Sequence, residues 1–286
     1  MRIKIKIPRL LIDLLKECKK DPVLTFSIVF LGVVLIFAII PEIIAPYPYA
    51  YIDLNKRLLP PSLEHIFGTD GLGRDIFSRI VYGARYEIFI ILLATLIGMP
   101  IGLILGFISG YFGGSFDRVI SLITDVQLSF PPFILMMIIV LLLGPSLINA
   151  IIAVSIYLVP IYVRLVRGQV LVEREKLYIE AAIAVGSSSW RILVKHILPN
   201  TSGPLVVQTI LNSSSAILNV AALSFLGFGA QPPTPEWGTM MMEGRPYFMT
   251  APHAILFPGL MIFLLVFSLN TIGERLREIV DPMLKI

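Results

Sequence analysis

Six long apolar runs dominate this 286-residue chain. A helix needs about 20 residues to cross a hydrocarbon layer about 30 Å thick, and these runs have that length. They cover residues 23–45, 88–112, 119–143, 147–166, 205–226 and 254–272. The chain is 56% hydrophobic, whereas soluble domains are about 45–50% apolar. The sequence therefore predicts an all-α, polytopic membrane protein with six transmembrane helices.

The runs divide the chain into four parts. We expect a basic segment over 1–22, a first transmembrane helix over 23–45, a loop over 46–87, and a core over 88–286 with five helices and a polar loop over 168–200. Seven basic residues precede the first run, which ends in a poor cleavage site. The run is therefore predicted to remain as an anchor and not to be removed as a signal peptide.

The positions of lysine and arginine predict the orientation, because these residues are enriched in cytoplasmic loops. With the N-terminus inside, most of the 23 basic residues fall on the cytoplasmic side. We therefore expect both termini and the 168–200 loop in the cytoplasm. The net charge of +4 reflects this bias and gives no reason to expect nucleic-acid binding.

The 168–200 loop has a spaced pattern, which is Glu180, Ala181, Ala182, Gly186, Leu198 and Pro199. Good helix formers fill residues 171–184, and Gly186 interrupts them. Three serines at 187–189 can cap a second helix, which we expect Pro199 to end. Two short helices joined at a glycine form a compact projection, and the small alanines let another protein approach closely.

The 46–87 loop carries the glycine-rich segment Gly-Thr-Asp-Gly-Leu-Gly-Arg-Asp at 68–75. Asp70, Arg74 and Asp75 can form a local ion-pair network there, because the glycines allow the tight backbone that it requires. Two interpretations stay open. The segment is a structural clamp ahead of the second helix, or it contacts a substrate or a partner protein.

These two segments resemble the permeases of ATP-binding cassette (ABC) importers in the dipeptide, oligopeptide and nickel branch. Further matches are His196 to Asn200, Leu223 to Gly229, and Pro235 to Gly238. His196 stands where the broad family has isoleucine, as is frequent in this branch. The resemblance runs from about residue 23 to Asp281-Pro282, and the chain looks like the second of two permease subunits.

The resemblance implies a type I importer permease fold (MetI-like) and a multi-pass protein of the cell membrane. It implies four kinds of partner: a second homologous permease subunit, two ABC ATPase subunits, an extracytoplasmic substrate-binding protein and the lipid bilayer. The six residues of the spaced pattern, known as the EAA motif, would then couple the permease to its ATPase. Peptides are the expected cargo, with nickel or oligosaccharides as alternatives.

We expect no cofactor in this chain. It has no Gly-x-x-x-x-Gly-Lys-Ser/Thr phosphate loop, so ATP would be used by partner ATPase subunits. The three histidines are far apart in the sequence, so no metal site is predicted. Because no nucleophile–base pair is evident either, no catalytic residue is assigned.

Two patterns lie inside the predicted spans. Glycines 98, 102, 106 and 110 recur every four residues, which predicts close packing against another helix. Polar residues form one stripe along the fifth span, namely Gln208, Asn212, Ser215 and Asn219. Because polar side chains avoid lipid, this stripe either forms hydrogen bonds between helices or lines a wetted translocation path.

An ion-coupled secondary transporter is the competing class of protein. It would carry several intramembrane carboxylates and an inverted internal repeat. We find one such carboxylate, Asp125, and no convincing repeat. Asp125 is predicted to be the most buried acid of the spans and a structural hydrogen-bond partner.

Overall fold

The computed structural model describes residue 14, residues 17 and 18, and residues 21–280. Within these residues there are helices and loops but no strand, only one isolated bridge between Thr69 and Asp75. The predicted all-α class is confirmed. The basic residues of the N-terminal segment, Asp281-Pro282 and Lys285 lie outside the described residues.

Five helices of the described part are long and apolar enough to cross a membrane. They are α2 (Pro22–Ile39), α4 (Ile76–Phe112), α7 (Leu147–Arg174), α10 (Leu198–Phe225) and α12 (His253–Val280). A sixth candidate consists of α5 (Gly114–Ser129) and α6 (Pro132–Leu143), which meet at 95°. The structure therefore agrees with six spans when this bent pair is taken as one.

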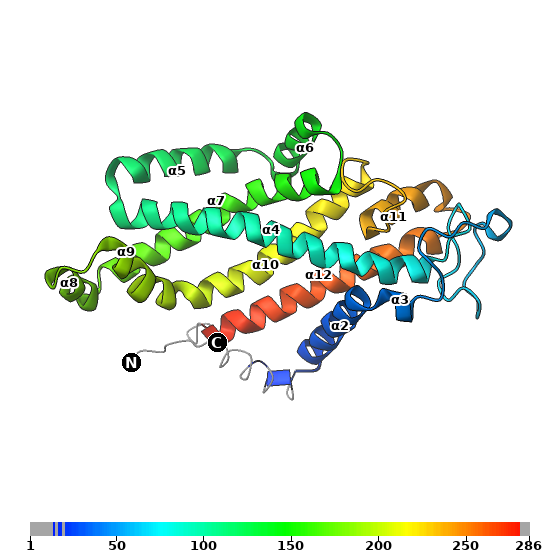
Figure 1. Cartoon of the computed structure of the whole chain (residues 1–286), viewed down its shortest axis with the longest axis horizontal. Helices are drawn as coiled ribbons and strands as arrows, with labels where there is room; N and C mark the ends of the chain where they lie inside the picture. Colours follow the sequence, from blue (N-terminus) through cyan, green and yellow to red (C-terminus); the bar gives the residue numbers. More distant parts are fainter. Residues whose placement is uncertain (1–13, 15–16, 19–20, 281–286) are drawn as a thin grey trace.

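The third span is thus not the single straight helix that its hydropathy predicted. Two consecutive prolines, Pro131 and Pro132, stand at the bend. Proline has no N–H to donate and disfavours helical geometry in the residue before it, so α5 ends at Ser129. In Figure 1, α5 runs beside α4 and α6 turns away from it.

Several helices are longer than their apolar runs. Helix α4 begins at Ile76 and not at residue 88, because the Asp75 carboxylate caps it and accepts from the Ser78 N–H at 2.7 Å. Helices α7 and α12 likewise extend beyond their predicted C-terminal ends. The first run is split by Pro41 into α2 and the short α3 (Pro41–Ile44).

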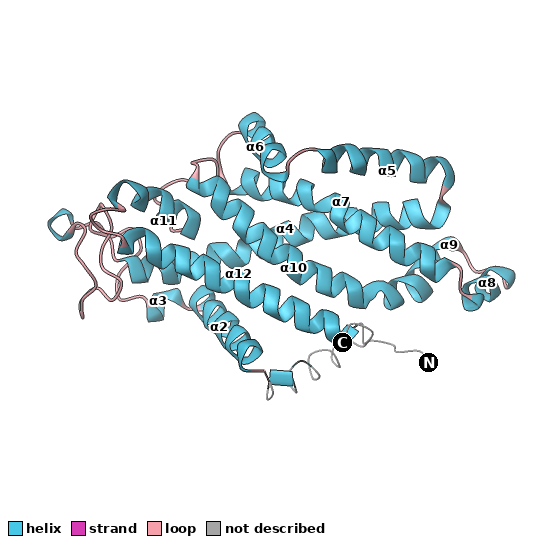
Figure 2. Ribbon diagram, turned by 180° about the vertical axis from the view of Figure 1, so that it is seen from behind, coloured by secondary structure: helices cyan, strands magenta, loops and turns pink. Residues whose placement is uncertain are grey.

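The remaining elements lie at the two ends of the helix bundle. Figures 1 and 2 show α8 and α9 at one end, and α11 with the loop before α4 at the other. Helix α2 runs toward the α11 end, and α12 runs away from it. These elements are η1 (Leu54–Lys56), α8 (Leu177–Ala184), α9 (Ser189–Ile192), the π-helical turn η2 (Leu193–Ile197), α11 (Trp237–Gly244) and η3 (Arg245–Tyr247).

The glycine stripe of α4 packs against α7, which confirms the predicted close helix contact. A Cβ atom added at Gly102 would lie 2.3 Å from the Cβ of Tyr162. At Gly106 it would lie 2.7 Å from the Cβ of Val166. Only a residue without a side chain allows the two backbones to approach this closely.

We expect Gly102→Val to destabilise the protein by about 1–3 kcal/mol, because the new side chain overlaps Tyr162 on α7. The measurement is the thermal unfolding midpoint of the purified protein. Gly32→Val on α2 is the matched control, because a Cβ atom there has nothing within 4 Å. Equal midpoints for the two variants would contradict a packing role for the stripe.

Candidate functional site

The spaced pattern of the 168–200 loop lies on α8 and around it. Helix α7 ends at Arg174, and α8 starts at Leu177, so the predicted helix over 171–184 is two helices. Glu180 and Ala181 are exposed on α8, whereas Ala182 is 8% exposed and packs inside its own chain. Of the two alanines, Ala181 alone is free to contact another protein.

Gly186 makes the turn after α8 in a left-handed backbone conformation, with φ of +77°. Its N–H donates to the carbonyl of Ile183 at 2.9 Å, and the Ser187 N–H donates to the carbonyl of Ala182 at 3.0 Å. Glycine adopts this conformation without strain, so it is the favoured residue after a helix end. The predicted interruption at Gly186 is confirmed.

The second helix of the loop does not stop at Pro199, so that prediction is wrong. Ser188 caps α9, and the chain continues through the π-helical turn η2 into α10. Leu198 and Pro199 occupy the first turn of α10, where proline is tolerated because its missing N–H costs little. The loop is therefore joined to α10 without a break.

Large apolar side chains are exposed around α8. Leu177 and Val185 are each 81% exposed, and Trp190 is 75% exposed. Figure 1 shows that α8 is the most projecting part of its end of the bundle. Exposed apolar groups clustered on a projection are typical of a surface that binds another protein.

The polar stripe of α10 forms hydrogen bonds along its own helix. The Gln208 side chain donates to Asn212 Oδ1 at 2.9 Å, and the Asn219 side chain donates to the Ser215 carbonyl at 2.8 Å. Asn212 is buried, and its Nδ2 has no partner within the described residues. These bonds satisfy part of the stripe without contacting a second helix.

A neighbouring residue outside the stripe makes a hydrogen bond between helices, which was one of the two interpretations left open for the stripe. The Ser214 hydroxyl donates to Asn270 Oδ1 of α12 at 2.6 Å. Gln208 lines a cavity of about 280 Å³ together with residues of α7 and α12, which include Gln169 and Arg277. Whether the stripe lines a path for cargo therefore remains a prediction.

Asp125 is not the most buried acid. It lies on α5 with 62% of its side chain exposed and pairs with Arg164 of α7 at 2.7 Å. The prediction failed because α5 is peripheral and covered on one side only.

Among the described residues, the fully buried acids are Glu87 on α4 and Glu236 before α11. Glu87 accepts from the Trp237 N–H at 3.2 Å, and Glu236 caps α11 by accepting from the Thr239 N–H at 2.7 Å. Burial raises the pKa of Glu236, which lies outside the spans. The sequence did not predict the burial of Glu87, because this residue directly precedes the apolar run 88–112 and falls in the predicted loop 46–87.

Asp70 and Arg74 form an ion pair at 2.6 Å, as expected. Each is also bound to a residue that the sequence did not indicate. Arg79 pairs with Asp70 at 2.6 Å, and Glu243 of α11 pairs with Arg74 at 2.8 Å and with Arg79 at 2.7 Å. This outer cluster of Asp70, Arg74, Arg79 and Glu243 ties the loop to α11.

Asp75 does not belong to the outer cluster. Its carboxylate pairs with His65 Nδ1 at 2.9 Å and caps α4. Both Arg74 and Arg79 are at most 3% exposed. This degree of burial supports the clamp interpretation of the 68–75 segment, because buried charges must be paired.

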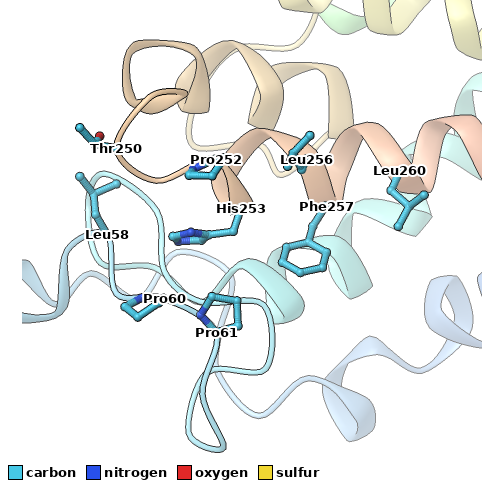
Figure 3. A pocket seen from close by; sticks show the side chains of 9 residues that line it. All are labelled: Leu58, Pro60, Pro61, Thr250, Pro252, His253, Leu256, Phe257 and Leu260. Atoms are coloured by element: carbon cyan, nitrogen blue, oxygen red, sulfur yellow. The ribbon is translucent and has the colours of Figure 1, made fainter.

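The same loop lies against the start of α12 around an apolar cavity of about 750 Å³. Figure 3 shows Pro60 and Pro61 on the loop side of the cavity and His253 with Phe257 on the α12 side. The rings of Phe67 and Phe257 stack at 4.1 Å between centroids. The loop before α4 is therefore held by apolar contacts as well as by the outer cluster.

The described residues contain no group of three or more His, Cys, Asp or Glu side chains that could hold a metal ion. The surface that stands out is the projection formed by α8 and α9, at the end of the bundle opposite the outer cluster.

Comparisons with known proteins agree with this picture. The family model for the "binding-protein-dependent transport system inner membrane component" matches residues 98–286. The model for the "N-terminal TM domain of oligopeptide transport permease C" matches residues 10–61. The family match covers more than half of the chain.

Two relatives align over most of their length. The dipeptide transport system permease protein DppC of Alkalihalophilus pseudofirmus is 44% identical over 270 residues, which are 94% of this chain and 89% of the relative. The glutathione transport system permease protein GsiD of Shigella flexneri is 46% identical over 257 residues, which are 90% of this chain and 85% of the relative.

A solved structure of the inward-facing methionine ABC transporter MetNI has the same fold, with a TM-score of 0.54 and 21% sequence identity. The match covers 71% of this chain and 96% of the other. It confirms the type I (MetI-like) permease fold. The chain therefore belongs to the binding-protein-dependent transport system inner membrane component family, and is a non-catalytic, multi-pass inner-membrane permease of an ABC importer in the peptide family.

Proposed function

We propose that this permease forms half of a translocation path for peptides. The observation that carries the proposal is the high identity, along nearly the whole chain, to relatives named for dipeptide and glutathione transport. Nickel and oligosaccharides are the alternative cargoes. To test which cargo is correct, the partner binding protein is screened by calorimetry against di- and tripeptides, nickel and oligosaccharides. Binding of nickel or sugar without peptide would overturn it.

The proposed assembly contains a second homologous permease subunit, two ABC ATPase subunits and an extracytoplasmic substrate-binding protein. The exposed Leu177, Val185 and Trp190 support an ATPase contact at α8 and α9, because they need a protein surface to cover them. ATP would bind to the ATPase subunits and not to this chain.

In the proposed coupling, the projection formed by α8 and α9 would transmit movements of the ATPase to the helix bundle. Glu180 and Ala181 would contact the ATPase, and Gly186 would set the angle of α8. Ala182 would support α8 from the inside, where it is buried. Closure of the ATPase dimer on ATP would draw the two coupling loops together and open the helices outward. Hydrolysis would reset them.

The proposed orientation places both termini and α8 in the cytoplasm. The opposite directions of α2 and α12 support a common side for both termini, and the distribution of lysine and arginine supports the cytoplasm as that side. Reporters fused after Lys285 or within residues 173–190 should be active only as cytoplasmic reporters. The paired measurement is alkaline phosphatase and fluorescent-protein activity in cells. A phosphatase signal from either position would disprove the orientation.

Glu180→Lys reverses a charge on the exposed face of α8, and Gly186→Pro removes the left-handed turn, since proline fixes φ near −65°. Each should abolish uptake and substrate-stimulated ATP hydrolysis while the membrane level of the protein stays near normal.

Glu175→Lys is the matched control for the charge reversal, because Glu175 is exposed in the same loop but outside α8. It should keep most of the uptake. Normal transport by both Glu180→Lys and Gly186→Pro would refute the coupling role.

A wetted path along α10 would make Ser215 and Asn219 accessible to water. In a Cys18→Ser background, cysteines at these positions should react with a small water-soluble thiol reagent faster than Ile217→Cys, because Ile217 is 0% exposed. The labelling rate should also change when nucleotide traps the transporter. Protection of both positions in every trapped state would favour a purely structural stripe.

A further inference from the structure

Tyr178 connects the coupling projection to two membrane helices. It lies in the first turn of α8, and its hydroxyl donates to Glu173 Oε2 in the last turn of α7. The same hydroxyl accepts from Asn200 Nδ2 in the first turn of α10 at 2.9 Å. We call Glu173, Tyr178 and Asn200 the Tyr178 network.

The donors and acceptors of this network match. The Tyr178 hydroxyl has one proton, which it gives to Glu173, and it receives one from Asn200. The second amide proton of Asn200 goes to the His196 carbonyl in η2 at 2.7 Å. The order of donors is therefore fixed, with Glu173 as the acceptor at its end.

Burial strengthens the bond between Tyr178 and Glu173, whereas Asn200 is exposed. Glu173 is 6% exposed and is bound by Lys176 as well as by Tyr178. Hydrogen bonds to a charged acceptor that is shielded from water are stronger than those between neutral groups. The Tyr178 ring also lies against the ring of His196, with 6.1 Å between centroids.

Helix α8 has few other means of attachment. It has eight residues, and only Ile179 and Ala182 are buried. A helix this short is not stable alone, and its connection to α9 turns at Gly186, a flexible residue. Beside the buried Ile179 and Ala182, polar contacts at its start therefore help to fix the position of α8.

We propose that Tyr178 is a positioning residue whose hydroxyl joins α8, α7 and α10 into one rigid body. A displacement of α8 by the ATPase then moves the ends of both membrane helices together, and α10 carries the movement into the membrane. This proposal rests on the proposed coupling function and adds the residue that transmits it.

The test measures distances between spin labels in the complete transporter, reconstituted with its ATPase subunits, in a Cys18→Ser background. One label pair is Val172→Cys on α7 with Ile183→Cys on α8, and the other is Ile183→Cys with Leu218→Cys on α10. These three side chains are at least 52% exposed. The distances are measured in two states of the transporter, one without nucleotide and one trapped by ATP with vanadate.

With Tyr178 present, each pair should give one narrow distance that is the same in both states. Tyr178→Phe keeps the ring and loses both hydroxyl hydrogen bonds, so both distances should become broad while the ATPase stays bound. Tyr82→Phe is the matched control. Its ring packs on Tyr49, and within the described residues its hydroxyl forms no hydrogen bond.

Variants of Glu173 distinguish a positioning role of the Tyr178 hydrogen bonds from a general effect on folding. Glu173→Gln keeps an oxygen that accepts from Tyr178 and should retain the narrow distances, whereas Glu173→Leu should lose them. Narrow distances in Tyr178→Phe overturn the proposal, as does loss of the assembled complex, which would make the role structural. The coupling function fails independently of this result, when both Glu180→Lys and Gly186→Pro still transport.

Discussion

The contact between α4 and α7 is the constraint on which the rest of this permease depends. Lipid offers helices no hydrophobic reason to associate, so contact area and hydrogen bonds must hold them together. The glycines of α4 remove the side chains that would keep α7 at a distance. Helix α7 is thereby fixed along its length, and the projection formed by α8 and α9 follows directly from its end.

The other helices are arranged around this pair. Two ion pairs attach α5 to α7, and the pair of Asp117 with Arg167 is the more buried of the two. Asp117 also accepts a hydrogen bond from the Ser109 hydroxyl of α4. At one end of the bundle the outer cluster binds the long loop to α11. At the other end the Tyr178 network binds α8 to α7 and α10. Charged and polar contacts thus hold the two ends and also join α5 to α7 and α10 to α12, whereas glycines allow α4 and α7 to pack closely.

The sequence predicted the features that depend on local spacing. The glycine stripe, the turn at Gly186 and the pairing of Asp70 with Arg74 all involve residues within a few turns of one another, and all are present. The direction of a helix is not encoded in hydropathy, so the bend between α5 and α6 was missed although Pro131 and Pro132 mark it. Pairing of Arg79 with Glu243 could not be foreseen, because the two residues are far apart in the chain.

The site residues also divide into features that local spacing predicts and features that depend on the folded structure. The EAA motif residues could be placed in one loop from their spacing, but the burial of Ala182 depends on how α8 lies against its own chain. The intrahelical bonding of the α10 stripe follows from rotamers that a sequence does not specify. The family assignment decides against the ion-coupled secondary transporter, an alternative that composition alone left open.

The outer cluster has a consequence for the order in which the protein is made. Arg74 and Arg79 lie in the first third of the chain, and their shared partner Glu243 is synthesised 169 and 164 residues later. Until α11 has been made, two guanidinium groups must stay hydrated or share Asp70 alone. This end of the bundle therefore closes late in biogenesis, and a chain truncated before Glu243 would leave Arg74 and Arg79 without their second carboxylate.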